Sequence, residues 1–393
     1  MTTSIEMPVL DSVDAGGQRS PALDSLEVEG YKSIRSAKVE LGAINVLIGA
    51  NGSGKSNLVG LFGLLADLAD RRLQLHVARQ GGADALLHFG AKKTPVMGFS
   101  LRFGLRGYQA SLIPVVGDTL VFEYEATLQW VAREANQDPL SGDPIPMYLG
   151  RSGHKETELR FNPMDSREDL IGATGPVVVA MKRWRPFHFH DTGKSAPTKQ
   201  KHKIDDNQTL RSEGDNLAPF LFALRSIAPG AYRRIVESVR AVAPFFDDFV
   251  LEPDVINPGV IQLAWRHTMD DGLFTADSLS DGTLRFICLA TLLLQPTLPS
   301  LIVIDEPELG LHPFAIAQLA ALVRAAATKT QVILATQSVT LLDQFDASEV
   351  IVTERSNGES TFRRLDESAL TEWKQEYSLG ELWLKNVLGG RPR

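Results

Sequence analysis

The sequence predicts an α/β fold with a mostly parallel sheet, an antiparallel β subdomain and a helical or loop insertion. In the C-terminal half of the 393-residue chain, apolar strand-like runs alternate with segments of helical periodicity, as in right-handed crossovers on a parallel sheet. In the N-terminal half, apolar residues alternate with other residues at period two, which indicates half-buried antiparallel strands. Between these halves, residues from about 132 to 215 carry glycine-, proline- and lysine-rich stretches, which indicate the insertion.

The first predicted elements are two strands and a helix. Leu26–Tyr31 and Ala43–Ile48 have strand character, and Lys55–Asp70 has apolar residues at helical spacing. Met97–Leu105 and Leu120–Trp130 are the two alternating runs, and each is long enough for one antiparallel strand.

The later elements alternate between helices and strands. Helices are predicted at Asn216–Ile227, Ala231–Val242, Thr283–Leu294, Phe314–Ala327 and Val339–Phe345. Strands are predicted at Phe249–Glu252, Val260–Trp265, Leu301–Ile304, Gln331–Ala335 and Val350–Thr353.

A glycine-rich turn lies between the second strand and the first helix. Gly49–Ser56 reads GANGSGKS and matches the P-loop pattern at each specified position. Glycines let successive backbone N–H groups point at phosphate oxygens, and the helix N-terminus adds positive potential. We expect Lys55 to bridge the β- and γ-phosphates of ATP and the Ser56 hydroxyl to bind Mg²⁺. The predicted ATP-binding residues here are Asn51, Gly52, Ser53, Gly54, Lys55, Ser56 and Asn57.

Two adjacent acids follow a strand of the C-terminal half. The apolar run Leu301–Ile304 is typical of a buried strand, and Asp305 and Glu306 come directly after it. We expect Asp305 to hold Mg²⁺ and Glu306 to accept a proton from the attacking water. Glu308 stands two positions further on, where a solvent-facing position is the alternative to a role in the site.

On these motifs the sequence resembles the ABC ATPase superfamily of P-loop NTPases. Leu279–Thr283 reads LSDGT and opens a predicted helix upstream of Asp305, where that family carries its signature motif. Ala335–Ser338 reads ATQS and stands where the family carries its switch residue, which makes Gln337 a second catalytic candidate.

Two further segments resemble the RecF/SMC/OLD branch, including RecF-like AAA ATPases without a nuclease domain. They are Gly30–Ile34 before the turn and Glu308–Pro313 after the acids. The resemblance implies that Lys32 approaches the nucleotide, while a surface lysine remains the alternative. His188–Asp191 is also similar to a segment of these ATPases.

The resemblance implies that two chains bind head to tail as a homodimer or a higher homo-oligomer. Each ATP would then lie between one P-loop and the signature helix of the other chain, where Ser280 and Gly282 present donors to the γ-phosphate. The chain departs from the family pattern at Asp281, where a glycine is usual, at Gln337, where a histidine is usual, and at His312, where an aspartate is usual.

The motifs divide the chain into five predicted segments. They are a flexible N-terminal tail (1–25), an N-terminal ATPase lobe with the P-loop (26–131), an insertion or helical subdomain (132–247), a C-terminal ATPase lobe with signature and Walker B (248–365) and a C-terminal helical tail (366–393).

The amino-acid composition excludes several classes of protein. Hydrophobic residues make up 44% of the chain, enough for a sizeable core, and the formal net charge of −8 argues against nucleic-acid binding over the whole surface. One cysteine, Cys288, excludes a disulfide framework and is expected in the core. Without a long apolar stretch or a secretory signal pattern, we expect no membrane partner and a cytoplasmic location.

One segment is locally basic. Lys182–Lys203 holds seven basic residues and one acid, Asp191. Contact with the phosphate backbone of DNA and a solvated loop both remain open as interpretations. Trp184, Phe187 and Phe189 are candidates either for base stacking or for packing.

Together these observations predict an enzyme with ATP and Mg²⁺ as ligands. ATP hydrolysis would drive nucleotide-dependent dimerisation in DNA repair, chromosome maintenance or phage defence. The alternative is a slow or non-hydrolysing scaffold whose ATP state controls a separate effector or nuclease chain. Residues 355–393 are too few for an appended nuclease domain.

Overall fold

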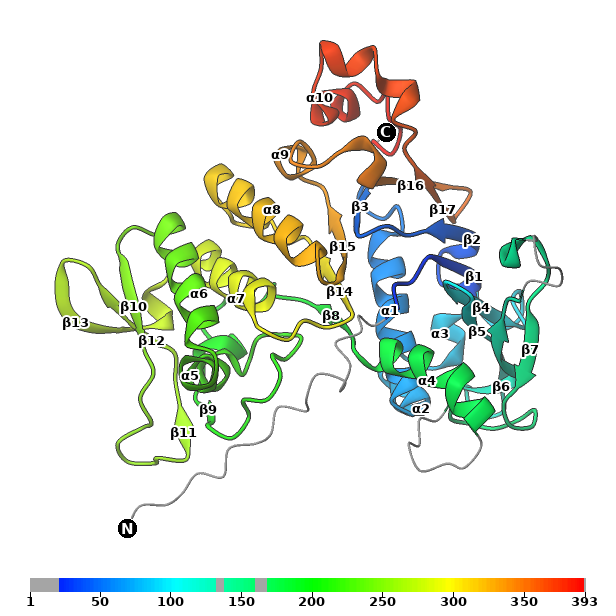
Figure 1. The fold of residues 1–393 in the computed structure, drawn as a ribbon, viewed down its shortest axis with the longest axis horizontal. Coiled ribbons are helices and arrows are strands. Elements are labelled where there is room, and N and C mark those ends of the chain that lie inside the picture. The colour runs from blue at the N-terminus through cyan, green and yellow to red at the C-terminus, as the bar shows by residue number, and fades with distance from the viewer. Residues whose placement is uncertain (1–20, 132–137, 160–167, 392–393) are drawn as a thin grey trace. The chain divides into compact units, whose positions relative to one another are not determined.

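The computed structural model describes residues 21–131, 138–159 and 168–391. These residues form two compact units, each discontinuous in sequence (Figure 1). The sheet unit comprises Ser20–Pro186, Pro299–Glu308 and Thr330–Arg393, and the helical unit contains Phe187–Leu298 and Leu309–Lys329. The five-segment division given above remains a prediction, and most of its N-terminal tail lies outside the described residues.

An antiparallel sheet forms one half of the sheet unit. Its strand order is β2-β1-β4-β5-β6-β7, and each described neighbouring pair is antiparallel. The strands are β1 Ser25–Tyr31, β2 Ile34–Glu40, β4 Met97–Phe103, β5 Arg106–Val115, β6 Thr119–Gln129 and β7 Ile145–Tyr148. Buried and half-buried residues alternate along β4 as the sequence predicts.

The second sheet of this unit has the order β17-β16-β3-β15-β14-β8. Its strands are β3 Ile44–Ile48, β8 Trp184–Phe187, β14 Leu301–Asp305, β15 Gln331–Thr336, β16 Val350–Ser356 and β17 Glu359–Arg364. The four strands β16, β3, β15 and β14 run parallel, and β17 pairs antiparallel with β16. The parallel strands therefore end at one edge of the sheet, which places the segments that follow them together.

Helix α1, Lys55–Ala69, lies in the core of the sheet unit. Its side chains form one hydrophobic cluster with residues of both sheets, and even Leu58, Leu61 and Leu64 are fully buried. The other helices of this unit are α2 Leu73–Arg79, α3 Ala83–Leu86, α4 Glu168–Lys182, α9 Val339–Leu342 and α10 Leu379–Leu384.

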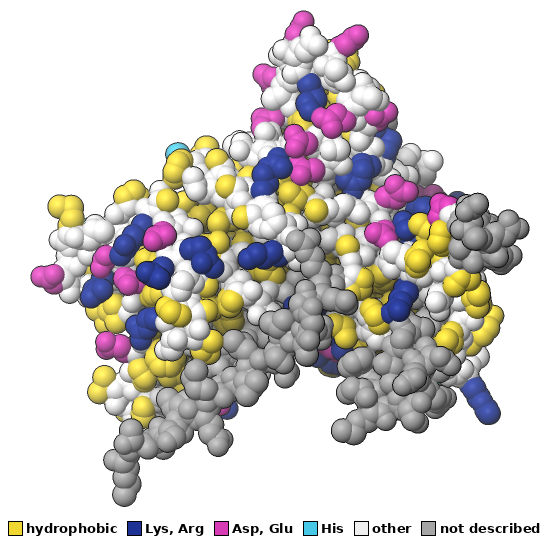
Figure 2. Space-filling model, viewed as in Figure 1, with side chains coloured by type: hydrophobic (Ala, Val, Ile, Leu, Met, Phe, Trp, Pro, Cys, Tyr) yellow, Lys and Arg dark blue, Asp and Glu magenta, His cyan; other side chains and the backbone are white. Residues whose placement is uncertain are grey.

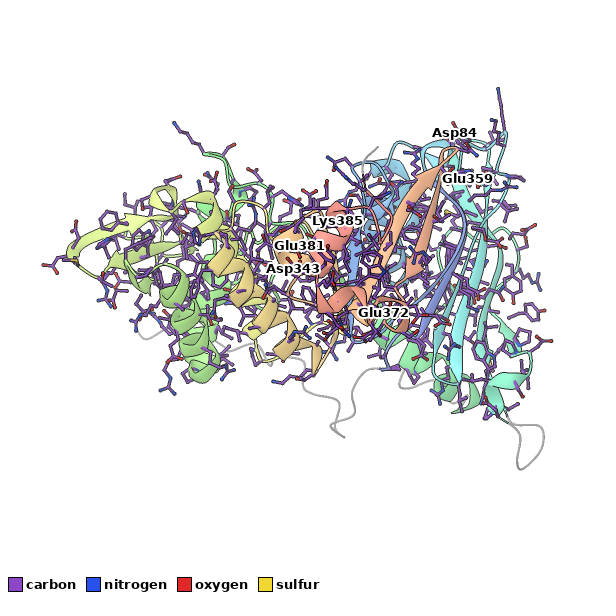
Figure 3. All side chains as sticks on the ribbon, turned by 90° about the horizontal axis from the view of Figure 1, so that it is seen from above. Asp84, Asp343, Glu359, Glu372, Glu381 and Lys385 are labelled. Atoms are coloured by element: carbon purple, nitrogen blue, oxygen red, sulfur yellow. The ribbon has the colours of Figure 1, made fainter. Side chains whose placement is uncertain are left out.

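Helix α10 is joined to the end of α9 by a side-chain contact. The Asp343 carboxylate accepts a hydrogen bond of 2.7 Å from the backbone N–H of Gly380 (Figure 3). Gly380 allows this approach, because a Cβ there would lie 2.9 Å from both Asp343 carboxylate oxygens.

The helical unit packs four helices beside a small antiparallel sheet. The helices are α5 Leu217–Ile227, α6 Pro229–Val242, α7 Asp281–Leu294 and α8 Pro313–Ala327. The sheet has the order β10-β12-β13, and β9 pairs with β11. These strands are β9 His202–Lys203, β10 Phe246–Val250, β11 Val260–Ile261, β12 Ala264–His267 and β13 Asp270–Thr275.

The predicted α/β fold with an antiparallel subdomain is confirmed, and the missed elements have identifiable causes. Helix α4 was not predicted, because Pro176 and the neighbouring glycines are signals for a loop. The predicted strand Val260–Trp265 divides into β11 and β12, and the predicted helix Val339–Phe345 is the shorter α9.

Strand β6 also departs from simple alternation, because Glu125 points into the core and is 2% exposed. Its carboxylate accepts hydrogen bonds from the Tyr108 hydroxyl at 2.6 Å, from the Thr157 hydroxyl and from the backbone N–H of Glu158 at 2.9 Å. Its Oε2 also lies 2.9 Å from Nε2 of His154. Burial raises the pKa of Tyr108 well above its usual value, so the phenol remains a donor. These partners explain how a glutamate replaces an apolar residue in this strand.

Cys288 lies in the core of the helical unit, as predicted. Its side chain is 1% exposed, and burial raises the pKa of its thiol to about 12. Among the described residues, no helix has the length and apolar character needed to cross a membrane.

We expect Cys288 to resist thiol-specific reagents at pH 8 in the folded protein and to react once the protein is unfolded in urea. The reactive species is the thiolate, which both burial and the raised pKa suppress. The rate of labelling checks this. Val116→Cys is the control, because position 116 is fully exposed and its thiol should react at once. Rapid labelling of the wild type without urea would contradict the expectation.

Candidate functional site

The glycine-rich turn joins the buried strand β3 to helix α1. Gly52 and Gly54 have backbone φ angles of +74° and +116°, a region that side chains other than glycine rarely adopt. A Cβ on Gly54 would also lie 2.7 Å from Cβ of Ser360. Both conformation and space therefore require glycine at position 54.

A chain of polar side chains braces this turn from outside. The Ser360 hydroxyl on β17 donates to the carbonyl of Ser53 at 2.6 Å, and its oxygen lies 2.7 Å from Oγ of Ser33. Nδ2 of Asn57, on the first turn of α1, donates to Oγ of Ser33 at 2.6 Å. We call Ser33, Ser360 and Asn57 the P-loop brace. It joins the turn to the β1–β2 connection and to β17.

Asn57 is the one residue of the brace that the sequence predicts for the ATP site. Asn57 directly follows the P-loop motif, whereas Ser33 lies within Gly30–Ile34, where the resemblance implies a role for Lys32 alone. Ser360 had no sequence signal, because it contacts Ser53 across 307 positions of the chain.

Lys55 lies over the turn and is 5% exposed. Its Nζ donates to the carbonyl of Gly49 at 2.7 Å and to that of Ala50 at 3.1 Å. Burial lowers the pKa of Lys55, while the carboxylates of Asp305, Glu306 and Glu308 act in the opposite direction. The ammonium group therefore lies in the field of all three acids.

The turn meets the end of β14 through Ser56 and Asp305. The Ser56 hydroxyl donates to Oδ2 of Asp305 at 3.0 Å. This contact follows from the sheet order, since β15 pairs in parallel with both β3 and β14. A hydroxyl and a carboxylate are hard oxygen ligands of the kind that Mg²⁺ takes in phosphate sites, so these two residues fit the predicted ion.

Glu306 and Gln337 also meet at this edge of the sheet. Glu306 follows the last residue of β14 and has a backbone φ of +43°. Its backbone N–H donates to the carbonyl of Ala335 at 2.7 Å. Nε2 of Gln337 donates to Oε1 of Glu306 at 2.6 Å. The structure thus brings the two predicted catalytic residues into direct contact.

Glu308 is half-buried, and the alternative of a solvent-facing side chain is wrong. Its Oε1 accepts a hydrogen bond of 2.6 Å from the Thr336 hydroxyl and one of 3.3 Å from the backbone N–H of Gln337. Burial raises the pKa of Glu308, although these hydrogen bonds act in the opposite direction.

Lys32 lies next to the P-loop brace in the same unit. Its backbone φ is +45°, and its Nζ donates to Oε1 of Gln80 at 3.0 Å. Its carbonyl lies 2.6 Å from Nδ1 of His88, and burial lowers the pKa of its side chain. Direct contact of Lys32 with a nucleotide remains a prediction.

The signature residues belong to the helical unit, whereas the P-loop and the carboxylates belong to the sheet unit. Ser280 caps helix α7, since its Oγ accepts a hydrogen bond of 3.2 Å from the backbone N–H of Thr283. A Cβ on Gly282 would overlap the carbonyl of Gly310. The imidazole of His312 caps α8 by accepting from the Phe314 N–H at 3.3 Å. Each of these residues therefore has a local structural role.

Comparisons with known proteins identify the family of the chain and structures of similar fold. Residues 44–343 match the family model described as "AAA domain, putative AbiEii toxin, Type IV TA system". The comparison with curated proteins found no match.

Solved structures of SMC head domains have a similar fold. The SmcHead bound to the C-winged helix domain of ScpA is 16% identical with a TM-score of 0.52, and the match covers 89% of this chain and 100% of that chain. An Smc head domain with an extended coiled coil, bound to the C-terminal domain of ScpA derived from Pyrococcus furiosus, is 15% identical with a TM-score of 0.51, and covers 91% and 99%.

We expect Gly54→Ala to weaken ATP binding at least tenfold. A residue other than glycine at a positive φ costs about 1–3 kcal/mol, and Ser360 leaves no room for the methyl group. Binding of a fluorescent ATP analogue measures the effect. Gly104→Ala is the control, because Gly104 has a φ of +59° with nothing within 4 Å of its added Cβ. Equal ATP affinity in the two variants would contradict the geometry described here.

Proposed function

Because the chain belongs to the AAA-domain family whose model it matches, we propose that it is an ATPase that binds Mg-ATP at Gly49–Ser56 and hydrolyses it. The observation that carries this proposal is the contact between Ser56 and Asp305. It joins the residue that follows the phosphate-binding lysine to Asp305, the acid at the end of β14. A glycine turn without a role in nucleotide binding would not need a carboxylate at this point.

The residues of the site have separate roles in the proposed reaction. Lys55 would neutralise the β- and γ-phosphates, and Ser56 and Asp305 would hold a metal ion, which would neutralise charge on the phosphoryl oxygens. Glu306 accepts the proton of the attacking water. The water oxygen bonds to the γ-phosphorus as the bond from that phosphorus to the β–γ bridging oxygen breaks, which releases ADP and phosphate. Gln337 holds Glu306 through the amide contact.

Two copies would form the complete ATP site, with Ser280 and Gly282 of one copy facing the P-loop of the other. This part of the proposal rests on the resemblance and on the exposure of Ser280 at the start of α7. ADP lacks the phosphate that the signature would contact, so hydrolysis would release the dimer. We propose that this cycle serves DNA repair, chromosome maintenance or phage defence, with a separate effector chain as partner.

A contact with DNA has limited support from the basic segment 182–203. Trp184, Phe187 and Phe189 are buried and act in packing. Lys199 is also buried and donates to the carbonyl of Thr192, and Lys201 pairs with Asp254.

Other basic side chains of the helical unit are more accessible. Arg233 and Arg234 of α6 are exposed, and Lys and Arg side chains gather over this helix on the face shown in Figure 2. If DNA is a partner, we therefore propose α6 as the contact, where binding would weaken steeply with salt.

The alternative is a scaffold that binds ATP and hydrolyses little of it. One observation favours it. The side-chain amide of Gln337 donates a hydrogen bond of 2.6 Å to Oε1 of Glu306, and Gln337 stands where the family carries a histidine. An amide cannot take up a proton, so turnover on this arrangement would be slower than with a histidine.

Lys55→Ala should weaken ATP binding about 10- to 100-fold, the loss of roughly 1.5–3 kcal/mol for hydrogen bonds to a charged group. Isothermal titration with Mg-ATP measures it. Lys38→Ala is the control, because Lys38 is an exposed lysine of the same unit that pairs with Glu27. Unchanged affinity in Lys55→Ala would exclude the proposed site.

Glu306→Gln should bind ATP as the wild type does and release phosphate about 10²–10⁴-fold more slowly, because an amide cannot act as the base. Phosphate release and size-exclusion chromatography with ATP measure turnover and dimerisation. We expect the variant to persist as an ATP-bound dimer, with Glu27→Gln as the control. Absence of phosphate release from the wild type and the variant alike would support the scaffold.

A further inference from the structure

Glu308 connects two segments that follow neighbouring strands. It lies just after β14, and its Oε1 accepts from Thr336 at the end of β15 and from the backbone N–H of Gln337. The Thr336 hydroxyl oxygen also accepts a hydrogen bond of 2.9 Å from the backbone N–H of Ser338. One carboxylate thus fixes the first residues of the segment that carries Gln337.

The segment that carries Gln337 also contacts Glu306. The side chain of Gln337 donates to Oε1 of Glu306 at 2.6 Å, while the Glu306 N–H donates to the carbonyl of Ala335 at 2.7 Å. A continuous path of hydrogen bonds therefore runs from Glu308 through the backbone and side chain of Gln337 to the carboxylate of Glu306.

The environment of Glu308 lowers the stability of the folded protein, which a role in packing alone would not explain. Within the described part of the chain, its Oε2 is buried and has no hydrogen-bonding partner. A buried carboxylate with an unsatisfied oxygen destabilises the folded state. Unfavourable features of this kind, such as a buried polar atom without a hydrogen bond, occur most often at functional sites.

We propose that Glu308 is a positioning residue for ATP hydrolysis, which fixes Gln337 so that the amide of Gln337 orients Glu306 toward the attacking water. This inference rests on the proposed function, in which Glu306 is the base. Glu308 itself does not contact the reacting atoms, and its effect passes through Gln337.

The test compares Glu308→Ala, Glu308→Gln, Gln337→Ala and the double variant Glu308→Ala/Gln337→Ala. We expect Glu308→Ala to lower kcat by about tenfold to a hundredfold, the scale expected for a misplaced catalytic group, with ATP affinity within about twofold of the wild type. Glu308→Gln should recover most of kcat, because its amide oxygen can accept both hydrogen bonds.

The double variant separates positioning from general damage. If Glu308 acts through Gln337, removing both side chains should lower kcat no further than Gln337→Ala alone. The proposal would be overturned if the double variant lost kcat by the product of the two single losses. It would also be overturned if Glu308→Ala kept the kcat of the wild type, or if Glu308→Gln lost as much kcat as Glu308→Ala. Glu27→Ala is the matched control, since Glu27 is an exposed glutamate on β1.

A second readout does not depend on turnover. In spectra of protein labelled with ¹⁵N-glutamine, the signals of Gln337 are identified by their loss in Gln337→Ala. We expect Glu308→Ala to shift both the backbone and side-chain amide signals of Gln337, and Glu308→Gln to shift them less. Unchanged Gln337 signals in Glu308→Ala would overturn the positioning role. Absence of phosphate release from the wild type would overturn the proposed ATPase activity instead.

Discussion

The parallel pairing of β3, β15 and β14 is the constraint on which the site depends. Because all three strands end at the same edge, the segments that follow them meet there, although they lie far apart in the sequence. The P-loop follows β3, the acidic pair ends β14, and Gln337 follows β15. Hydrogen bonds between these three segments join Ser56 to Asp305 and Gln337 to Glu306.

Much of this arrangement could be predicted from local signals. The P-loop pattern fixes its residues by spacing, and an apolar strand followed by Asp305 and Glu306 indicates the partner edge. Helical periodicity predicted α1 and α8 to within one residue at each end. Each of these signals depends on side chains within a few positions of one another. A single sequence is therefore sufficient to recognise them.

The remaining features depend on contacts that no local pattern encodes. Ser360 braces the P-loop from a strand near the other end of the chain, and a serine in a polar hairpin has no distinguishing context. Glu125 and Glu308 are acids in positions where exposure is the usual outcome, and only their tertiary partners explain their burial. Helix α4 contains Pro176, a residue that predicts a loop, although the neighbouring Val177 and Val178 are fully buried in the structure.

The P-loop brace has a consequence for the order in which the protein matures. A ribosome synthesises Ser33 and the P-loop first, whereas Ser360 follows 327 positions after Ser33. Until then the carbonyl of Ser53 and the hydroxyl of Ser33 lack their partner on β17. The nascent chain would therefore carry the full P-loop sequence without its final shape, and competence to bind nucleotide would arise late, after long-range strand pairing.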